Sequence, residues 1–177
     1  MKFLRNIFII FALMGSVTFT AEAQIEKGQK SLGFHGGYAT YNTSALAGVS
    51  FQYAFSRHFR LAPSVDYIFD HKDVDGLMFC LDYHGPVALN SARTVYFYHL
   101  LGLNYASWHH GRPKFDSVED VAPGEDVSSR DNNFGLDVGA GFEWYVRPTL
   151  RLSLEGKFNW IRHANTGLFY LGISYVF

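Results

Sequence analysis

Eight histidines and one cysteine are the residues of this 177-residue chain that could carry nucleophilic, acid–base or metal chemistry. A serine hydrolase needs a histidine within hydrogen-bond reach of its serine, and on a strand that arrangement usually reads His-x-Ser. No His-x-Ser occurs in the sequence. A histidine could still meet a serine across two strands, but no motif requires it. The sequence therefore predicts a protein that is not an enzyme.

Two groups of residues could bind a metal ion. Cys80, Asp82 and His84 alternate on one face of a strand, where a buried, hydrogen-bonded polar cluster is the simpler interpretation. His109 and His110 begin an acidic stretch that extends to Asn133, but its spacing matches no zinc or EF-hand pattern. We therefore expect no metal and no cofactor, and a solvated loop that contacts other molecules. The residues assigned to this contact loop are His109, His110, Arg112, Lys114, Asp116, Glu119 and Asp120.

The elements that position these groups are strands, because most of the chain alternates apolar and polar residues with a period of two. Short connections near residues 56–58, 90–93 and 147–149 alternate with longer ones, which is typical of an up-and-down meander. Strands are expected near 31–41, 45–55, 59–70, 77–89, 94–108, 133–146, 150–160 and 167–177.

The two faces of these strands differ in side-chain size and charge. One face is bulky and apolar, whereas the other combines small residues with charges. An eight-stranded interior is narrow, so we expect the small, charged face to point inward and the bulky face to meet lipid. The inward charges are Arg60, Asp66, Asp82, Asp137, Glu143, Arg151, Glu155 and Lys157.

Isolated charges inside such a barrel are costly. We therefore expect Arg60, Arg151 and Lys157 to pair with Asp66, Asp137, Glu143 and Glu155 in a network that plugs the interior. Two alternatives stay open: a soluble barrel with its apolar face inside, and a narrow or gated pore lined by these charges. Aromatic residues also collect at both strand ends, Trp108 among those at the loop end, as in the aromatic girdles of membrane barrels.

The N-terminus has the layout of a signal peptide. Two basic residues precede the apolar run 7–14, and Ala21-Glu22-Ala23 supplies a small-x-small cleavage site. We expect removal of residues 1–23 and a single domain over residues 24–177. The formal charge of −1 leaves no basic excess for nucleic acid.

The signal peptide, the segments 133–144 and 150–160 and the C-terminal stretch together resemble the OmpA-like outer-membrane β-barrel proteins, the small porin-family barrels of Gram-negative bacteria. That C-terminal stretch places Phe169, Leu171, Ile173, Tyr175 and Phe177 at alternate positions. In this family such an ending resembles the signal that the outer-membrane assembly machinery recognises. Pro63 and His99 depart from the pattern, and either could mark a bulge or a change of register.

The resemblance implies an eight-stranded antiparallel up-and-down transmembrane β-barrel, exported to the outer membrane of a Gram-negative bacterium. Its expected partners are outer-membrane lipids and lipopolysaccharide, and the assembly machinery and periplasmic chaperones during biogenesis; a monomer is expected. The implied role is structural, adhesive or surface-interactive through extracellular loops. A narrow pore and a lipid-modifying enzyme are the alternatives.

Overall fold

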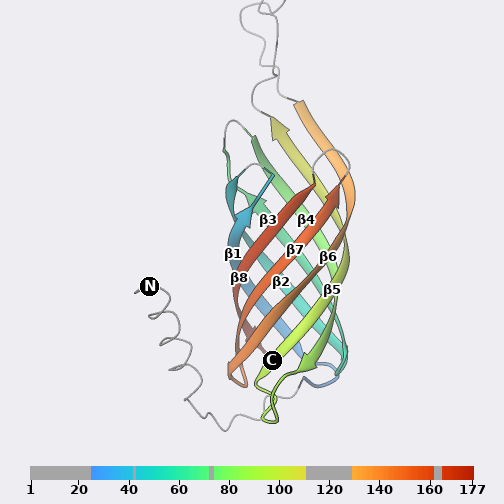
Figure 1. Cartoon of the computed structure of the whole chain (residues 1–177), viewed down its shortest axis with the longest axis vertical. Coiled ribbons are helices and arrows are strands. Elements are labelled where there is room, and N and C mark those ends of the chain that lie inside the picture. The colour runs from blue at the N-terminus through green and yellow to red at the C-terminus, as the bar shows by residue number, and fades with distance from the viewer. Residues whose placement is uncertain (1–24, 42, 72–73, 111–128, 162–164) are drawn as a thin grey trace, which may run out of the picture.

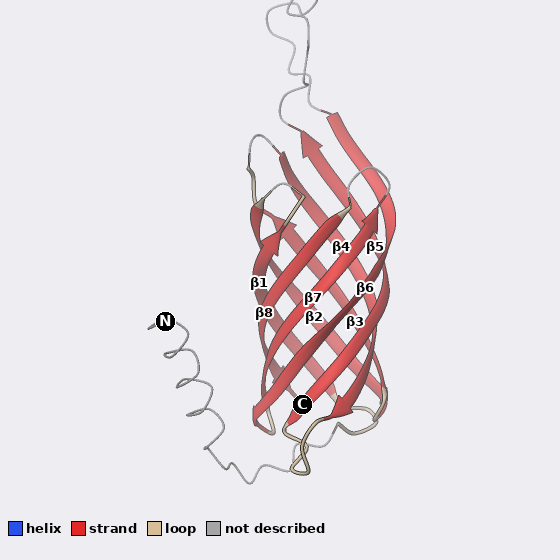
Figure 2. Ribbon diagram, viewed as in Figure 1, coloured by secondary structure: helices blue, strands red, loops and turns tan. Residues whose placement is uncertain are grey.

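The computed structural model describes residues 25–41, 43–71, 74–110, 129–161 and 165–177. Eight strands form one closed barrel in which each strand pairs with its sequence neighbours and the last pairs with the first (Figure 1). The strands are β1 (Lys30–Ala39), β2 (Ser44–Ser56), β3 (Phe59–Ile68), β4 (Val74–Ala88), β5 (Val95–His110), β6 (Ser129–Arg147), β7 (Leu150–Ile161) and β8 (Thr166–Val176). The predicted antiparallel up-and-down barrel is confirmed, and Figure 2 shows strands throughout the described wall.

The two ends of the barrel have different connections. The short turns β2–β3, β4–β5 and β6–β7 lie at one end, together with the C-terminus (Figure 1). Hydrogen bonds between Lys30 and Phe177 close β1 against the end of the chain at this short-turn end. At the opposite end, the loop end, β5 and β6 rise above the rest of the wall. Among the described residues, no helix has the length and apolar character needed to cross a bilayer.

Large apolar side chains cover the outside of the barrel. Because successive side chains on a strand point to opposite faces, every second residue is outward. Phe134 is 80% exposed and Leu171 is 69% exposed. The outward set includes Phe34, Val49, Tyr67, Leu81, Leu103, Leu136, Leu154 and Phe169. A monomer in water rarely shows so large a continuous apolar surface, and the predicted direction of the two faces is confirmed.

The two positions that depart from the barrel pattern keep their register. Pro63 is exposed, and the β2–β3 pairing has the same register on both sides of it. His99 is outward, against Tyr83 at a ring-centroid separation of 5.7 Å, and pairs with Gly85 and Ala140 without a shift. The irregularities lie at the short-turn end instead, between Ala54 and Ser56 and between Tyr145 and Arg147.

One aromatic position was predicted wrongly. Trp108 is 1% exposed and points into the barrel, so it is not part of a girdle. Alternation along β5 places it on the same face as Asn104 and Ala106, which are also buried. Its ring lies over Gly76 of β4, where an added Cβ would come within 2.8 Å of it.

Candidate functional site

The interior of the barrel is the candidate site, and it has three layers. Near the short turns an apolar cluster combines Ile25, Ala54, Tyr96, Tyr145 and Val176. Towards the loop end a second cluster contains Ala39, Leu46, Ile68, Met78, Cys80, Ala106, Trp108, Ile161, Leu168 and Tyr170. The predicted charges lie between these clusters and are buried, Glu155 only partly.

The first part of the charged layer is centred on Glu143. Both its oxygens accept hydrogen bonds from the Arg60 guanidinium, at 3.0 Å from Nη1 and 2.8 Å from Nη2. Arg151 Nη1 lies 3.5 Å from the same carboxylate. The Arg151 guanidinium also donates to Gln52 Oε1 at 2.7 Å and to Ser31 Oγ at 3.0 Å. Both arginines therefore approach Glu143, which is one of the four acids expected to pair with the cations.

The second part is centred on Lys157. Its ammonium donates to Asp82 Oδ2 at 2.9 Å and lies 3.9 Å from Asp137 Oδ2. Asp137 Oδ1 accepts from the side-chain amides of Asn104 and Asn159, the latter at 2.6 Å. Lys157 therefore pairs with Asp137, as predicted, but its shorter contact is with Asp82, which the predicted pairing left out.

Two predicted partners do not meet the cations. Asp66 accepts hydrogen bonds from His35 and, at 3.2 Å, from the Tyr170 hydroxyl. Glu155 accepts from the Tyr98 hydroxyl at 2.7 Å. The predicted pairing of Asp66 and Glu155 with arginine or lysine is wrong, because both arginines converge on Glu143 and histidine and tyrosine side chains occupy the space beside these two acids.

Further polar side chains, none of them Asp, Glu, Arg or Lys, complete the network and were not predicted. They are His35, Gln52, Tyr98, Asn104, Asn159 and Tyr170. All lie on the inward face, so alternation alone would have found them as members. Their individual partners depend on the register of strands that are far apart in sequence.

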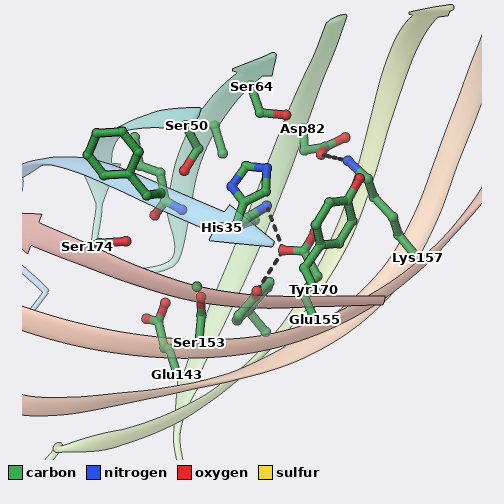
Figure 3. Close-up of a pocket in the computed structure, with 16 residues that line it drawn as sticks. His35, Ser50, Ser64, Asp82, Glu143, Ser153, Glu155, Lys157, Tyr170 and Ser174 are labelled. Atoms are coloured by element: carbon green, nitrogen blue, oxygen red, sulfur yellow. Dashed lines mark hydrogen bonds and ion pairs between the residues drawn. The ribbon is translucent and has the colours of Figure 1, made fainter. Parts of the chain in front are cut away.

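A small polar cavity lies within the charged layer (Figure 3). Its volume is about 40 Å³, and His35, Ser50, Ser153 and Ser174 are among its lining residues. A histidine beside Asp66 and near serine hydroxyls is the cross-strand arrangement that the sequence left open. The cavity has room for about three waters, which is far too little for a lipid acyl chain.

The proposed ligand residues on β4 also have structural partners. Asp82 is held by Lys157, His84 stacks on Tyr98 at 4.6 Å between ring centroids, and Cys80 is buried in the apolar cluster near the loop end. Within the described ranges, no group of three or more His, Cys, Asp or Glu side chains is arranged to hold a metal ion.

The predicted contact loop is shorter than expected. His109 lies on β5, where its Nδ1 is 3.0 Å from Asp75 Oδ1, because strand pairing continues to His110 and resumes at Ser129. The side chain of His110, and residues Arg112, Lys114, Asp116, Glu119 and Asp120, lie outside the described residues, as does the predicted signal peptide.

The residues of the predicted assembly signal lie on one face of the barrel. Phe169, Leu171, Ile173, Tyr175 and Phe177 are all outward and exposed. The alternation read from the sequence is confirmed, while recognition by an assembly machinery stays a prediction.

Comparison with known proteins supports the fold. No protein-family model and no curated protein matches the chain. The structure is similar to the N-terminal β-barrel domain of Pseudomonas aeruginosa OprF, with a TM-score of 0.68, 17% identity and coverage of 86% of this chain and 100% of that one. Ail, the attachment invasion locus protein of Yersinia pestis, gives a TM-score of 0.57 at 17% identity over 85% of this chain and 99% of its own. A de novo designed transmembrane β-barrel gives 0.59 at 16% identity over 87% and 99%.

These similarities define the structural class. The chain has the fold of the small eight-stranded outer-membrane β-barrels of Gram-negative bacteria. A designed barrel matches about as well as a natural one. The similarity therefore establishes the fold but no particular activity.

Proposed function

We propose that this protein is a non-enzymatic, integral outer-membrane β-barrel that acts as a structural or adhesive element through its loop end. The observation that carries this proposal is the continuous apolar exterior on a closed sheet. A closed barrel pairs all its strand edges, and only such a sheet can place strands in lipid. Each strand has at least ten residues, enough to span a bilayer when tilted.

The loop end is the proposed contact surface because β5 and β6 extend it beyond the rest of the wall (Figure 1). Asp75 and His109 are paired there, and Asp131, which is opposite Trp108 in the β5–β6 pairing, is exposed at the same end. The predicted contact residues from His110 to Asp120 continue from this position in the sequence. Ail, which shares the fold, is by name an attachment and invasion protein, and an attachment role fits a hairpin that projects from the membrane.

The interior argues against the alternatives. Apolar clusters lie on both sides of the charged layer, and the cavity between them is about 40 Å³. A continuous channel would need at least one of these clusters to move. A lipid-modifying enzyme must bring an acyl chain to its catalytic groups, whereas the cavity beside His35 and the serines has room for only about three waters. We therefore expect a silent planar bilayer, and unchanged lipid A mass spectra in a deletion strain.

Membrane insertion is tested by gel mobility of the outer-membrane fraction. The unboiled protein should migrate differently from the boiled protein, because a closed barrel resists detergent. Recovery from the soluble periplasm without a mobility shift would refute the proposal.

Orientation is tested with single cysteine variants, since Cys80 is buried and should give little background. Asp131→Cys places a thiol at the loop end, and Thr149→Cys places one in the exposed β6–β7 turn at the other end. A membrane-impermeant maleimide should label only the first in intact cells and both after lysis. Labelling of the second alone would reverse the orientation and refute the contact surface.

A further inference from the structure

A second cavity lies at the short-turn end of the barrel, outside the charged layer described above. Its volume is about 170 Å³, and its lining residues are Ile25, Arg57, His58, Pro86, Ala88, Arg93 and Tyr96. Three of these are basic or imidazole side chains, and none of the described lining residues is acidic. The others form an apolar wall.

The two arginines at this cavity are exposed and form no ion pair within the described structure. The interior arginines differ, since both converge on Glu143. Two guanidinium groups around one hollow create a positive potential that attracts anions, and the imidazole can add a hydrogen-bond donor. The planar guanidinium is suited to bind a carboxylate or phosphate through two parallel hydrogen bonds.

The backbone of Arg93 supports a role for its side chain. Its φ of 51° lies in the left-handed region, where glycine and asparagine are favoured and other residues are uncommon. Asn90 fixes this turn: its Oδ1 accepts from the backbone N–H groups of Thr94 at 2.9 Å and Val95 at 3.1 Å. A long charged side chain at a position suited to glycine suggests a function for that side chain.

The turn that carries Arg57 is also fixed by hydrogen bonds. The His58 N–H donates to Ser56 Oγ at 3.3 Å, and the Tyr83 hydroxyl donates to the His58 carbonyl at 3.3 Å. Hydrogen bonds therefore fix the backbone of both turns that carry the basic side chains. This lowers the conformational entropy that the turns lose when a ligand binds.

We propose that this cavity binds the free C-terminal carboxylate of a peptide that ends in a small apolar residue. Arg57, His58 and Arg93 hold the carboxylate, and Ile25, Pro86, Ala88 and Tyr96 contact the last side chain. The apolar wall favours this ligand over inorganic phosphate, because phosphate has no apolar group that could pack against the wall. Access from the periplasm rests on the orientation proposed above, whereas binding by the purified protein does not.

The test is a calorimetric titration of the refolded full chain in zwitterionic detergent with N-acetyl-dialanine, its C-terminal amide and inorganic phosphate. The free acid should bind saturably, and the amide and phosphate should each bind at least about tenfold more weakly. Equal binding of acid and amide would overturn the proposal. Phosphate binding as tightly as the peptide would also overturn it.

The matched variants separate binding from folding. Arg93→Gly relieves the left-handed backbone, so the barrel should stay folded by gel mobility while the affinity for the acid falls about tenfold. Arg57→Gln should lower the affinity similarly. Arg147→Gln removes an exposed arginine from the last position of β6, at the same end of the barrel. Arg147 does not line the cavity, so this change should leave the affinity unchanged. Unchanged affinity in Arg93→Gly would refute the site, even if the barrel is inserted and oriented as proposed.

Discussion

Glu143 should be the charge whose loss destabilises the barrel most, because two guanidinium groups depend on it. Arg60 donates two hydrogen bonds to it. The other side-chain neighbours of this guanidinium within the described residues carry no negative charge: His84 Nδ1 is 3.4 Å from Nη2, and the Tyr98 ring centroid is 5.6 Å from Cζ. Arg151 lies 3.5 Å from Glu143 but also has neutral acceptors. Removing the carboxylate charge would therefore leave Arg60 buried with no anionic partner.

The size of the effect follows from what each replacement keeps. In Glu143→Gln the side-chain carbonyl can still accept one hydrogen bond from Arg60. The free energy of unfolding should therefore fall by about 3 kcal/mol, which is at the low end of the usual cost of removing one partner from a buried ion pair. In Glu143→Leu neither hydrogen bond survives, and the loss should approach about 5 kcal/mol. These losses correspond to about two to four powers of ten in the unfolding equilibrium constant.

The assay is urea unfolding of the barrel in phospholipid vesicles, followed by tryptophan fluorescence. Glu26→Gln, at an exposed carboxylate near the N-terminal end of the described chain, is the control and should change the free energy of unfolding by less than about 0.5 kcal/mol. In the double variant Arg60→Met/Glu143→Gln the unpaired Arg60 charge is gone, so its loss should be smaller than the sum of the two single losses. A Glu143→Gln protein within about 1 kcal/mol of the wild type would refute the view that these guanidinium groups are dry and dependent on one carboxylate.

Three further predictions concern barrel closure, the lipid-facing surface and assembly. Gly37→Ala would place a Cβ against the Phe169 carbonyl of β8, so we expect it to lower the free energy of unfolding by about 1–3 kcal/mol. Gly36→Ala is the control and should be neutral in the same urea titration, because its added Cβ would be 3.6 Å from the nearest atom. Leu154 points outward in the middle of β7, so Leu154→Arg should lower the free energy of unfolding by about 2–4 kcal/mol. Leu89 is exposed just after the end of β4, so Leu89→Arg should lower it by about 1 kcal/mol or less. Equal costs would argue against a bilayer around the barrel. Phe177→Ala should lower the amount of protein in the outer membrane but not refolding of the purified protein in detergent; normal levels in cells would contradict its assembly role.

Alternation of side chains made most of the fold predictable from the sequence. Whether a charged side chain points inward depends only on its place in the alternation along its own strand, and all eight charges predicted to point inward do so. The error at Trp108 came from grouping it by its position at a strand end instead of by its parity with Asn104 and Ala106. Extension of β5 to His110 was not predictable in this way, because the polar residues there follow no apolar alternation.

Partner choice inside the barrel could not be read from the sequence for a different physical reason. Asp66 binds His35, 31 residues away, and Tyr170, 104 residues away. Each contact depends on the stagger of several strands together, and the sequence of one strand does not fix that stagger. The same holds for Arg57 and Arg93, which meet at one cavity only because two turns lie side by side.

The charged layer also explains how one register is selected. A slip of one residue would turn every apolar side chain inward, so alternation alone excludes it. A slip of two residues keeps the bulky face outward and changes little in contact with lipid, because most outward side chains are large and apolar. The same slip would move Glu143 about 6.6 Å along its strand, out of reach of Arg60. The buried ion pairs therefore distinguish registers that the lipid-facing surface cannot, even if apolar residues of equal volume would give the barrel similar stability.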